Sequence, residues 1–184
     1  VPADIIMKVL KLTCEFYEGD WVGALDIQQE LDVWTPRWWF NAHTQAMTNT
    51  SFYEYENVSD YPEWAEAILN EQVICILDTE EIARTNPKEY QQYLRLSAKS
   101  VIAAPYYKGV TGFLIVRNPK KHAENPDYLK LMAYVVSCEM NDQRLLDNCR
   151  HKMQAEEISD SNEVLIRLFG GLEIITAQRI VKSE

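Results

Sequence analysis

The chain has 184 residues, enough for one domain with a full hydrophobic core and a fragment of a second. Hydrophobic residues make up 47% and charged residues 25% of the sequence, a balance typical of globular proteins that argues against disorder. The net charge of −10 disfavours direct binding to nucleic acid or to an anionic membrane, and no apolar run is long enough to span a bilayer. Because the sequence starts at Val1 and ends within a β-like pattern, we expect it to be a piece of a longer protein.

The four cysteines indicate the cellular compartment. They are Cys14, Cys75, Cys138 and Cys149, and no two of them have C-x-x-C spacing. The first three lie among apolar residues, which is typical of buried, reduced thiols. The sequence therefore predicts a cytoplasmic protein without disulfides.

The first predicted element is a helix over residues 4–18, because apolar side chains recur there every three or four residues. Its apolar stripe consists of Ile5, Ile6, Val9, Leu12, Thr13 and Phe16. Residues 20–28 and 31–41 are predicted strands, and Pro36 in the second predicts an edge, a bulge or a bend. Residues 43–59 are polar and predict a loop that contains a short strand or extended segment.

The middle of the chain predicts short helices around one strand. A helix is expected over residues 60–70, with Asp60 as its N-cap. The apolar run at 72–78 predicts a buried strand, and 79–84 a single helical turn. Asn86-Pro87 is a typical helix start, with a capping side chain followed by a proline in the first turn.

Residues 100–118 predict a β-hairpin. Its two apolar runs, Val101–Ala104 and Phe113–Val116, do not alternate with polar residues, so both faces of the hairpin should be covered. Lys108-Gly109 between them predicts a two-residue turn, since glycine adopts the positive φ that such a turn needs.

A long helix is predicted from Asn125-Pro126-Asp127 to about residue 152. Its early turns are apolar on two sides, and its later turns keep a narrow apolar seam. This pattern is expected if the helix first packs on its own sheet and then pairs with another helix. The polar segment 153–163 predicts a linker, and residues 164–184 predict the start of a second domain, truncated here.

The hairpin also carries the pattern of a known family. Ser100 precedes an apolar strand that ends in Pro105, Gly112 precedes the next strand, and Asp127 with Leu129–Met132 opens the last helix. Together with the order of the elements, this pattern resembles the GAF domain over residues 1–152.

The resemblance implies an α+β fold with a GAF/PAS-like central antiparallel β-sheet flanked by helices. It places the first and last helices on one face, where they often form a dimer interface, and a ligand pocket between the sheet and residues 43–96. GAF domains bind cyclic nucleotides, tetrapyrroles, haem or metabolites, and some bind nothing. The residues expected at the dimer interface are Ile5, Val9, Phe16, Leu145 and Cys149.

The aromatic residues between Trp34 and Trp64 are the main indication of a ligand, because such side chains supply stacking walls and polar handles. The alternative is that they fill the core. The pocket residues expected from the sequence are Trp38, Phe40, Tyr53, Trp64, Cys75 and Tyr106. The ligand and any cofactor stay open.

No pattern in the sequence indicates catalysis. A Cys-His step, expected for covalent tetrapyrrole attachment, does not occur, and the cyclic-nucleotide signature is incomplete. His43, His122 and His151 are far apart, so no metal site is predicted. Redox chemistry by the cysteines is an alternative that would need exposed thiols of low pKa.

The last twenty residues indicate what kind of domain follows the sensory domain. Residues 164–174 resemble the opening strands of the winged helix-turn-helix domain of SARP-type bacterial activators. The sequence therefore predicts a ligand-sensing and dimerisation domain of a bacterial transcriptional regulator, which contacts DNA only through a domain absent from this chain. The alternatives are the input domain of a diguanylate cyclase or histidine kinase, a redox enzyme of GAF fold, and a ligand-free dimerisation module.

Overall fold

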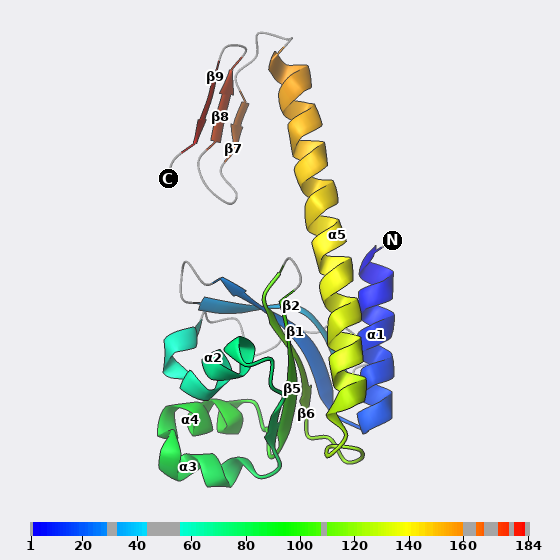
Figure 1. Cartoon of the computed structure of the whole chain (residues 1–184), viewed down its shortest axis with the longest axis vertical. Helices are drawn as coiled ribbons and strands as arrows, with labels where there is room; N and C mark the ends of the chain where they lie inside the picture. The colour runs from blue at the N-terminus through cyan, green and yellow to red at the C-terminus, as the bar shows by residue number, and fades with distance from the viewer. Residues whose placement is uncertain are drawn as a thin grey trace. The chain divides into compact units, whose positions relative to one another are not determined.

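A six-stranded antiparallel sheet lies at the centre of residues 1–141 in the computed structural model (Figure 1). The structure describes residues 2–28, 33–43, 56–107, 110–159, 165–167, 173–176 and 179–182. The strand order is β3-β2-β1-β6-β5-β4. The strands are β1 (Trp21–Gln28), β2 (Val33–Asn41), β3 (Glu56–Asn57), β4 (Ile74–Ile76), β5 (Val101–Tyr106) and β6 (Gly112–Arg117).

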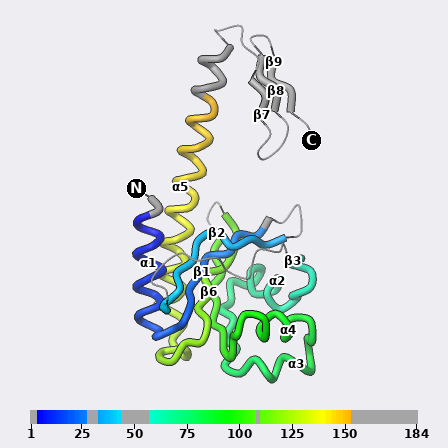
Figure 2. Tube along the Cα trace, turned by 180° about the vertical axis from the view of Figure 1, so that it is seen from behind, coloured from blue at the N-terminus to red at the C-terminus, as the bar shows by residue number. Residues whose placement is uncertain are grey.

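Helices cover both faces of this sheet (Figure 2). The α-helices are α1 (Pro2–Tyr17), α2 (Pro62–Leu69), α3 (Ile82–Thr85), α4 (Pro87–Arg95) and α5 (Pro126–Ser159), and the 3-10 turns are η2 (Val58–Asp60) and η3 (Thr79–Glu81). The terminal helices α1 and α5 lie on one face, and α2 and α4 on the other. This arrangement confirms the predicted α+β class with both terminal helices on one face.

Residues from 142 onward form a second unit. Its three-stranded antiparallel sheet consists of β7 (Leu165–Arg167), β8 (Glu173–Thr176) and β9 (Arg179–Lys182), in that order. The helix α5 continues to Ser159, so the segment predicted as a linker begins inside the helix. Among the described residues, no helix has the length and apolarity needed to cross a membrane.

The central hairpin is covered on both faces, as its sequence predicts. Strands β5 and β6 pair from Val101 with Arg117 to Tyr106 with Gly112, and their inner residues are buried. The connection spans residues 107–111 and is longer than the predicted two-residue turn. Lys108 and Gly109 themselves lie outside the described residues.

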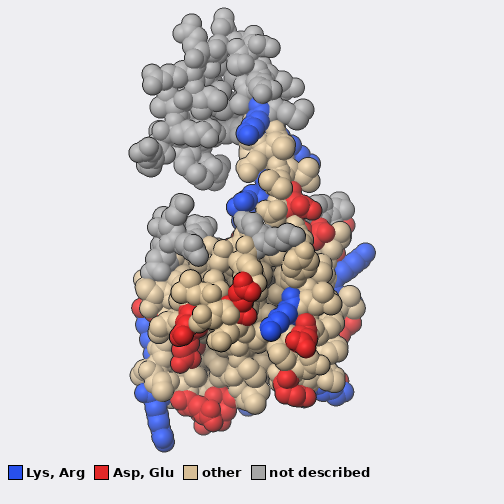
Figure 3. Space-filling view, viewed as in Figure 1, with Lys and Arg blue, Asp and Glu red and all other residues tan. Residues whose placement is uncertain are grey.

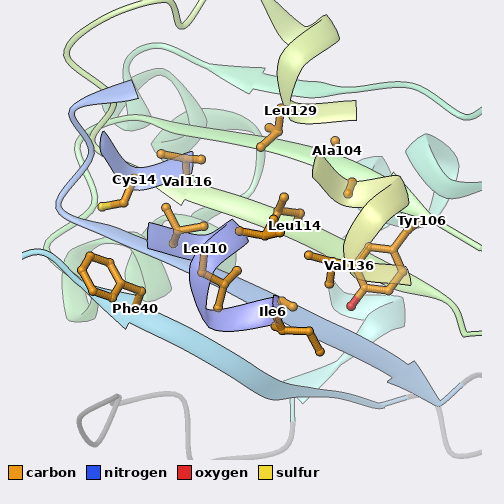
Figure 4. Packing of buried hydrophobic residues seen from close by; sticks show 14 of the residues in the cluster. Ile6, Leu10, Cys14, Phe40, Ala104, Tyr106, Leu114, Val116, Leu129 and Val136 are labelled. Atoms are coloured by element: carbon orange, nitrogen blue, oxygen red, sulfur yellow. The ribbon is translucent and has the colours of Figure 1, made fainter. Parts of the chain in front are cut away.

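The face under α1 and α5 holds a mainly aliphatic core (Figure 4). Strand residues such as Leu114 and Val116 meet Leu10 of α1 and Leu129 of α5, all nearly inaccessible to solvent. The buried stripe of α1 is Ile6, Val9, Leu10, Thr13, Cys14 and Tyr17. The predicted stripe was wrong at its edges: Ile5 is 44% and Leu12 55% exposed, because contact with the sheet selects a neighbouring face of the helix.

Two local predictions in the middle of the chain were wrong. The N-cap of α2 is Tyr61 and makes no side-chain cap, while the carboxylate of Asp60 pairs with Lys88. The buried strand predicted over 72–78 is the three-residue edge strand β4, in which Cys75 is exposed, and Leu77, just after it, is 64% exposed. An edge strand has a neighbour on one side only, so its apolar residues are less covered.

Strand β2 contains the irregularity that Pro36 predicts. Its register against β1 shifts between Ala24 and Leu25, which pair with Trp38 and Pro36. Arg37 is therefore an extra residue, a β-bulge. The Leu25 carbonyl at the bulge accepts a hydrogen bond of 2.8 Å from the Tyr106 hydroxyl.

Gly112 allows β6 to approach this bulge. A Cβ atom on Gly112 would lie 1.8 Å from the Leu25 carbonyl oxygen, which is backbone and cannot turn away. A Cβ on Gly19 would lie 2.8 Å from Cγ1 of Val116 and 3.1 Å from the Arg117 carbonyl oxygen, which is a much smaller overlap.

We expect Gly112→Ala to lower the free energy of unfolding by about 2–3 kcal/mol, because the added methyl group forces two strands apart. Gly19→Ala is the matched control and should cost clearly less. Urea denaturation followed by circular dichroism measures both. Equal losses in the two variants would contradict the assigned role of the Leu25 carbonyl.

Candidate functional site

A cavity of about 50 Å³ lies between the sheet and the helices α2 and α4. It occupies the face opposite α1 and α5, in the region where the GAF resemblance implies a pocket. Its described lining consists of Trp21, Leu25, Trp34, Tyr61, Trp64, Gln92, Tyr93, Leu96, Ala98, Val101, Ile115 and Arg117.

Aromatic rings form much of the wall. The Trp34 ring lies 4.6 Å from the Tyr61 ring and 5.4 Å from the Trp64 ring, measured between centroids. Trp64 in turn meets Phe113 of β6 edge-on, with centroids 4.9 Å apart. Such tilted and edge-to-face contacts are favourable for aromatic pairs and hold the rings in fixed positions. The wall is therefore built from side chains that brace one another.

A buried carboxylate, Glu89 of α4, holds two of the wall residues. Glu89 is 1% exposed, and its Oε1 accepts hydrogen bonds from the Trp64 indole N–H, at 2.8 Å, and from the Tyr93 hydroxyl. Its Oε2 accepts a third from the Asn86 side-chain amide, at 3.1 Å. A buried carboxylate is costly unless its lone pairs are satisfied, and these three donors satisfy it.

The same network joins α2 to α4. The Asn86 amide also donates to the Asp60 carbonyl at 3.2 Å, and the Asn86 side-chain oxygen caps α4 by accepting from the Glu89 backbone N–H. Burial, together with the Glu89 carboxylate, raises the pKa of Tyr93 well above its ordinary value. The phenol therefore stays protonated and remains a donor to Glu89.

Arg117, at the end of β6, is the one cationic residue in the described lining. Its Nε donates to the Asp20 carboxylate at 2.8 Å, and its Nη1 donates to the Leu96 carbonyl at 2.6 Å. The guanidinium carbon lies 5.9 Å from the centroid of the Trp21 ring. The Asn118 side chain donates to the same Asp20 carboxylate at 2.7 Å. The positive charge at the cavity is thus neutralised by Asp20.

Trp34 differs from the other polar residues of the wall. Its indole nitrogen is buried and has no hydrogen-bond acceptor within the described parts of the chain. The side chain as a whole is 3% exposed. An unpaired buried donor costs free energy, so an acceptor supplied from the cavity would be stabilising.

The structure brings one predicted pocket residue, Trp64, to the cavity. Trp38, Phe40 and Tyr106 belong instead to the core under α1 and α5, which corrects the expectation that they line the pocket. The β-bulge explains the first two: an extra residue at 37 inverts the alternation of β2, so Trp34 faces the cavity and Trp38 faces away.

Cys75 and Tyr53 do not contribute to the described lining either. Cys75 lies exposed on the edge strand β4, next to the Ala123 carbonyl, and Tyr53 lies outside the described residues.

The predicted dimer residues separate into buried and exposed ones. Val9 is 8% exposed and belongs to the core, so the prediction that it lies at a dimer interface was wrong. The Phe16 ring is partly buried and stacks on Tyr128, with centroids 4.1 Å apart. Ile5, Leu145 and Cys149 are exposed.

Two of the four thiols, Cys14 and Cys75, are poorly suited to redox chemistry. Burial raises the pKa of Cys14 to about 11, and burial with Glu124 nearby raises the pKa of Cys75. A raised pKa lowers the thiolate fraction on which reactivity depends. In the described lining of the cavity there is no cysteine, and the described residues contain no group of three metal-ligating side chains.

Sequence reasoning missed Glu89 and Arg117. The spacing Asn86-x-x-Glu89 at the start of a helix is the pattern of a capping box, and it could have drawn attention to Glu89. Its burial against Trp64 depends on a contact between residues 25 positions apart, which no local pattern indicates.

We expect Glu89→Ala to lower the free energy of unfolding by about 3 kcal/mol, because it leaves the Trp64 and Tyr93 donors unpaired in the core. Glu89→Gln keeps one acceptor oxygen and should cost about 1 kcal/mol. Chemical denaturation measures both. The exposed Glu80→Ala is the control and should change stability little. A Glu89→Ala variant as stable as the control would contradict the role of the network.

No protein-family model matches the sequence, and no curated protein is similar to it. Solved structures are similar in fold. The blue-light-absorbing form of the PixJ GAF domain from Thermosynechococcus elongatus has a TM-score of 0.62 at 15% identity, over 83% of this chain and 92% of that chain. A GAF domain from Synechocystis sp. PCC6803, in its photoproduct state, has a TM-score of 0.63 at 12% identity, over 80% and 98%. The phycocyanobilin-bound GAF domain of a cyanobacterial phytochrome has a TM-score of 0.61 at 12% identity, over 79% and 87%. Identities at this level establish the fold alone: as the hairpin pattern predicts, the chain has the fold of a GAF domain.

Proposed function

We propose that this chain is a non-catalytic, cytoplasmic sensory domain that binds a small molecule in the cavity between the sheet and α2–α4. The observation that carries the proposal is the cavity wall, in which braced aromatic rings surround a few fixed polar groups. Ligand pockets in proteins are typically mostly apolar, with a small number of such groups.

The ligand differs from that of the bilin-bound neighbour. The cavity of about 50 Å³ is far below the size of a tetrapyrrole, and no cysteine occurs in its described lining for covalent attachment. A smaller molecule, held without a covalent bond, agrees better with these residues.

Dimerisation is the second part of the proposal. Large apolar side chains are exposed on α1, at Ile5 and Leu12, and on α5, at Leu131 and Tyr134. The later turns of α5 expose Leu145 and Leu146 as well. Leu131 and Leu145 are separated by two heptads, the repeat of paired helices, so we expect a second copy of the chain to cover these residues.

The output is proposed to be a DNA-binding domain that begins near residue 164, in a bacterial transcriptional regulator. The three-stranded sheet β7–β9 favours this assignment, because a second, separate sheet follows the helix. Binding in the cavity would then alter the pairing of α1 and α5 between two copies. DNA would be contacted by that further domain, since acidic and basic side chains are interspersed on the face drawn in Figure 3.

The input domain of a diguanylate cyclase or histidine kinase is a second candidate. The observation that favours it is the length of α5, which remains helical to Ser159 and could continue into a coiled coil. A ligand-free dimerisation module is the third candidate, and the next experiment separates it from the first.

Native mass spectrometry of the purified protein tests the ligand. We expect a dimer that carries additional mass from a small molecule, released on denaturation. A panel of metabolites followed by thermal shift is the second arm, because a ligand that binds only the folded state raises the melting temperature. A protein without added mass and without any shift would contradict sensing and favour the ligand-free module.

We expect Leu145→Glu to convert the dimer into a monomer, because it places two like charges in the apolar seam of the paired helices. Light scattering after size-exclusion chromatography measures the mass. Leu69→Glu is the matched control, since Leu69 is 80% exposed on α2, outside the proposed seam. A dimer that persists in Leu145→Glu would contradict pairing through α5.

A further inference from the structure

The hydrogen-bonding state of the cavity wall restricts what can bind. The Trp64 indole and the Tyr93 hydroxyl both donate to Glu89, so neither donor is left for a ligand. The Trp34 indole N–H, in contrast, has no acceptor among the described residues, although Trp34 lines the same cavity and is 3% exposed. A molecule in the cavity that presents an acceptor to this N–H gains a hydrogen bond at no cost to an existing one.

The charge of the wall restricts the ligand further. Arg117 is bound to Asp20 at 2.8 Å and to the Leu96 carbonyl at 2.6 Å. An anionic ligand would have to compete with a carboxylate that is already in place. Burying an additional charge among the aromatic rings is costly unless it is paired. An uncharged ligand meets neither obstacle.

The volume sets an upper limit on size. A water molecule needs about 10–15 Å³ of such space, so the cavity of about 50 Å³ corresponds to a few waters. A cavity of about 150 Å³ binds benzene in another protein. One aromatic ring is therefore the largest group that a modest shift of the wall could admit.

We propose that the cavity selects a small, uncharged, mainly apolar molecule, no larger than one aromatic ring, that carries a hydrogen-bond acceptor for the Trp34 indole N–H. This inference rests on the proposed function, because it names the ligand class of the same cavity. Trp34 is the residue that determines specificity, and Glu89 acts through Trp64 and Tyr93 as a positioning residue.

Strand β2 supplies a matched control. The Trp38 indole nitrogen is also buried without an acceptor, but Trp38 packs on the opposite face of the sheet, under α1 and α5. A ligand in the cavity cannot reach it. Trp34→Phe and Trp38→Phe therefore each remove one unpaired N–H from the same strand. The Trp34→Phe substitution changes the cavity, and the Trp38→Phe substitution does not.

The test uses two rings of the same shape, pyridine and benzene, at a pH where pyridine is uncharged. Binding to the ¹⁵N-labelled protein is followed through the five tryptophan indole N–H signals. We expect pyridine to bind roughly fivefold more tightly than benzene, as expected for one net hydrogen bond, and to move the Trp34 signal downfield. Trp34→Phe should abolish the preference, and Trp38→Phe should retain it.

Three results would overturn the inference. If both rings bind with equal affinity and the NMR signals of cavity residues shift, the ligand does not need an acceptor for Trp34. The proposed ligand-binding function remains intact in that case. Tighter binding of benzoate than of pyridine contradicts the choice of an uncharged ligand. Binding of neither ring, at the highest concentration that leaves the protein folded, contradicts the inference that the cavity admits one aromatic ring, while native mass spectrometry judges the sensing function independently. The wild-type comparison stands even if a variant fails to fold.

Discussion

Both faces of the central strands β1, β5 and β6 are apolar, and each face therefore needs a cover of its own. The terminal helices α1 and α5 supply one cover and form an aliphatic core with Leu114 and Val116. The short helices α2 and α4 supply the other, through aromatic residues that pack on Phe113 and Ile115. Side chains alternate between the two faces of a strand, so the two cores are separate although the same strands support both. The sheet therefore carries two separate layers of helices, one on each face.

The aromatic layer contains the polar groups that give the cavity its chemistry. Helix α4 is amphipathic but short, and Glu89 fixes it to α2 by accepting a hydrogen bond from the Trp64 indole N–H. Arg117 also lines the cavity, and its pair with Asp20 joins β6 to the residue that precedes β1. In both networks the polar groups form hydrogen bonds with one another. The Trp34 indole N–H is a buried donor in the described lining that has no acceptor. We therefore expect the choice of ligand to depend on the Trp34 indole N–H, which forms no hydrogen bond within either network.

The sequence predicts the elements better than it predicts the faces they present. The continuous apolar runs of the hairpin, the helix start at Asn86-Pro87 and the irregularity at Pro36 depend on local chemistry, and all three were predicted. Which tryptophans of β2 face the cavity depends on the bulge at residue 37, since one extra residue exchanges the two faces. The exposure of Cys75 depends on its place at the sheet edge, and the burial of Glu89 on a distant partner. These outcomes follow from tertiary contacts that periodicity does not contain.

We infer from the two separate cores that the layer of α2 and α4 opens while the sheet stays folded. Native-state hydrogen exchange measured by mass spectrometry tests it most directly, because amides released by partial opening exchange before those that need global unfolding. The claim predicts that amides of α2 and α4 exchange together and earlier than those of β1, β5 and β6. Exchange of the helices and the central strands in a single global step would contradict it.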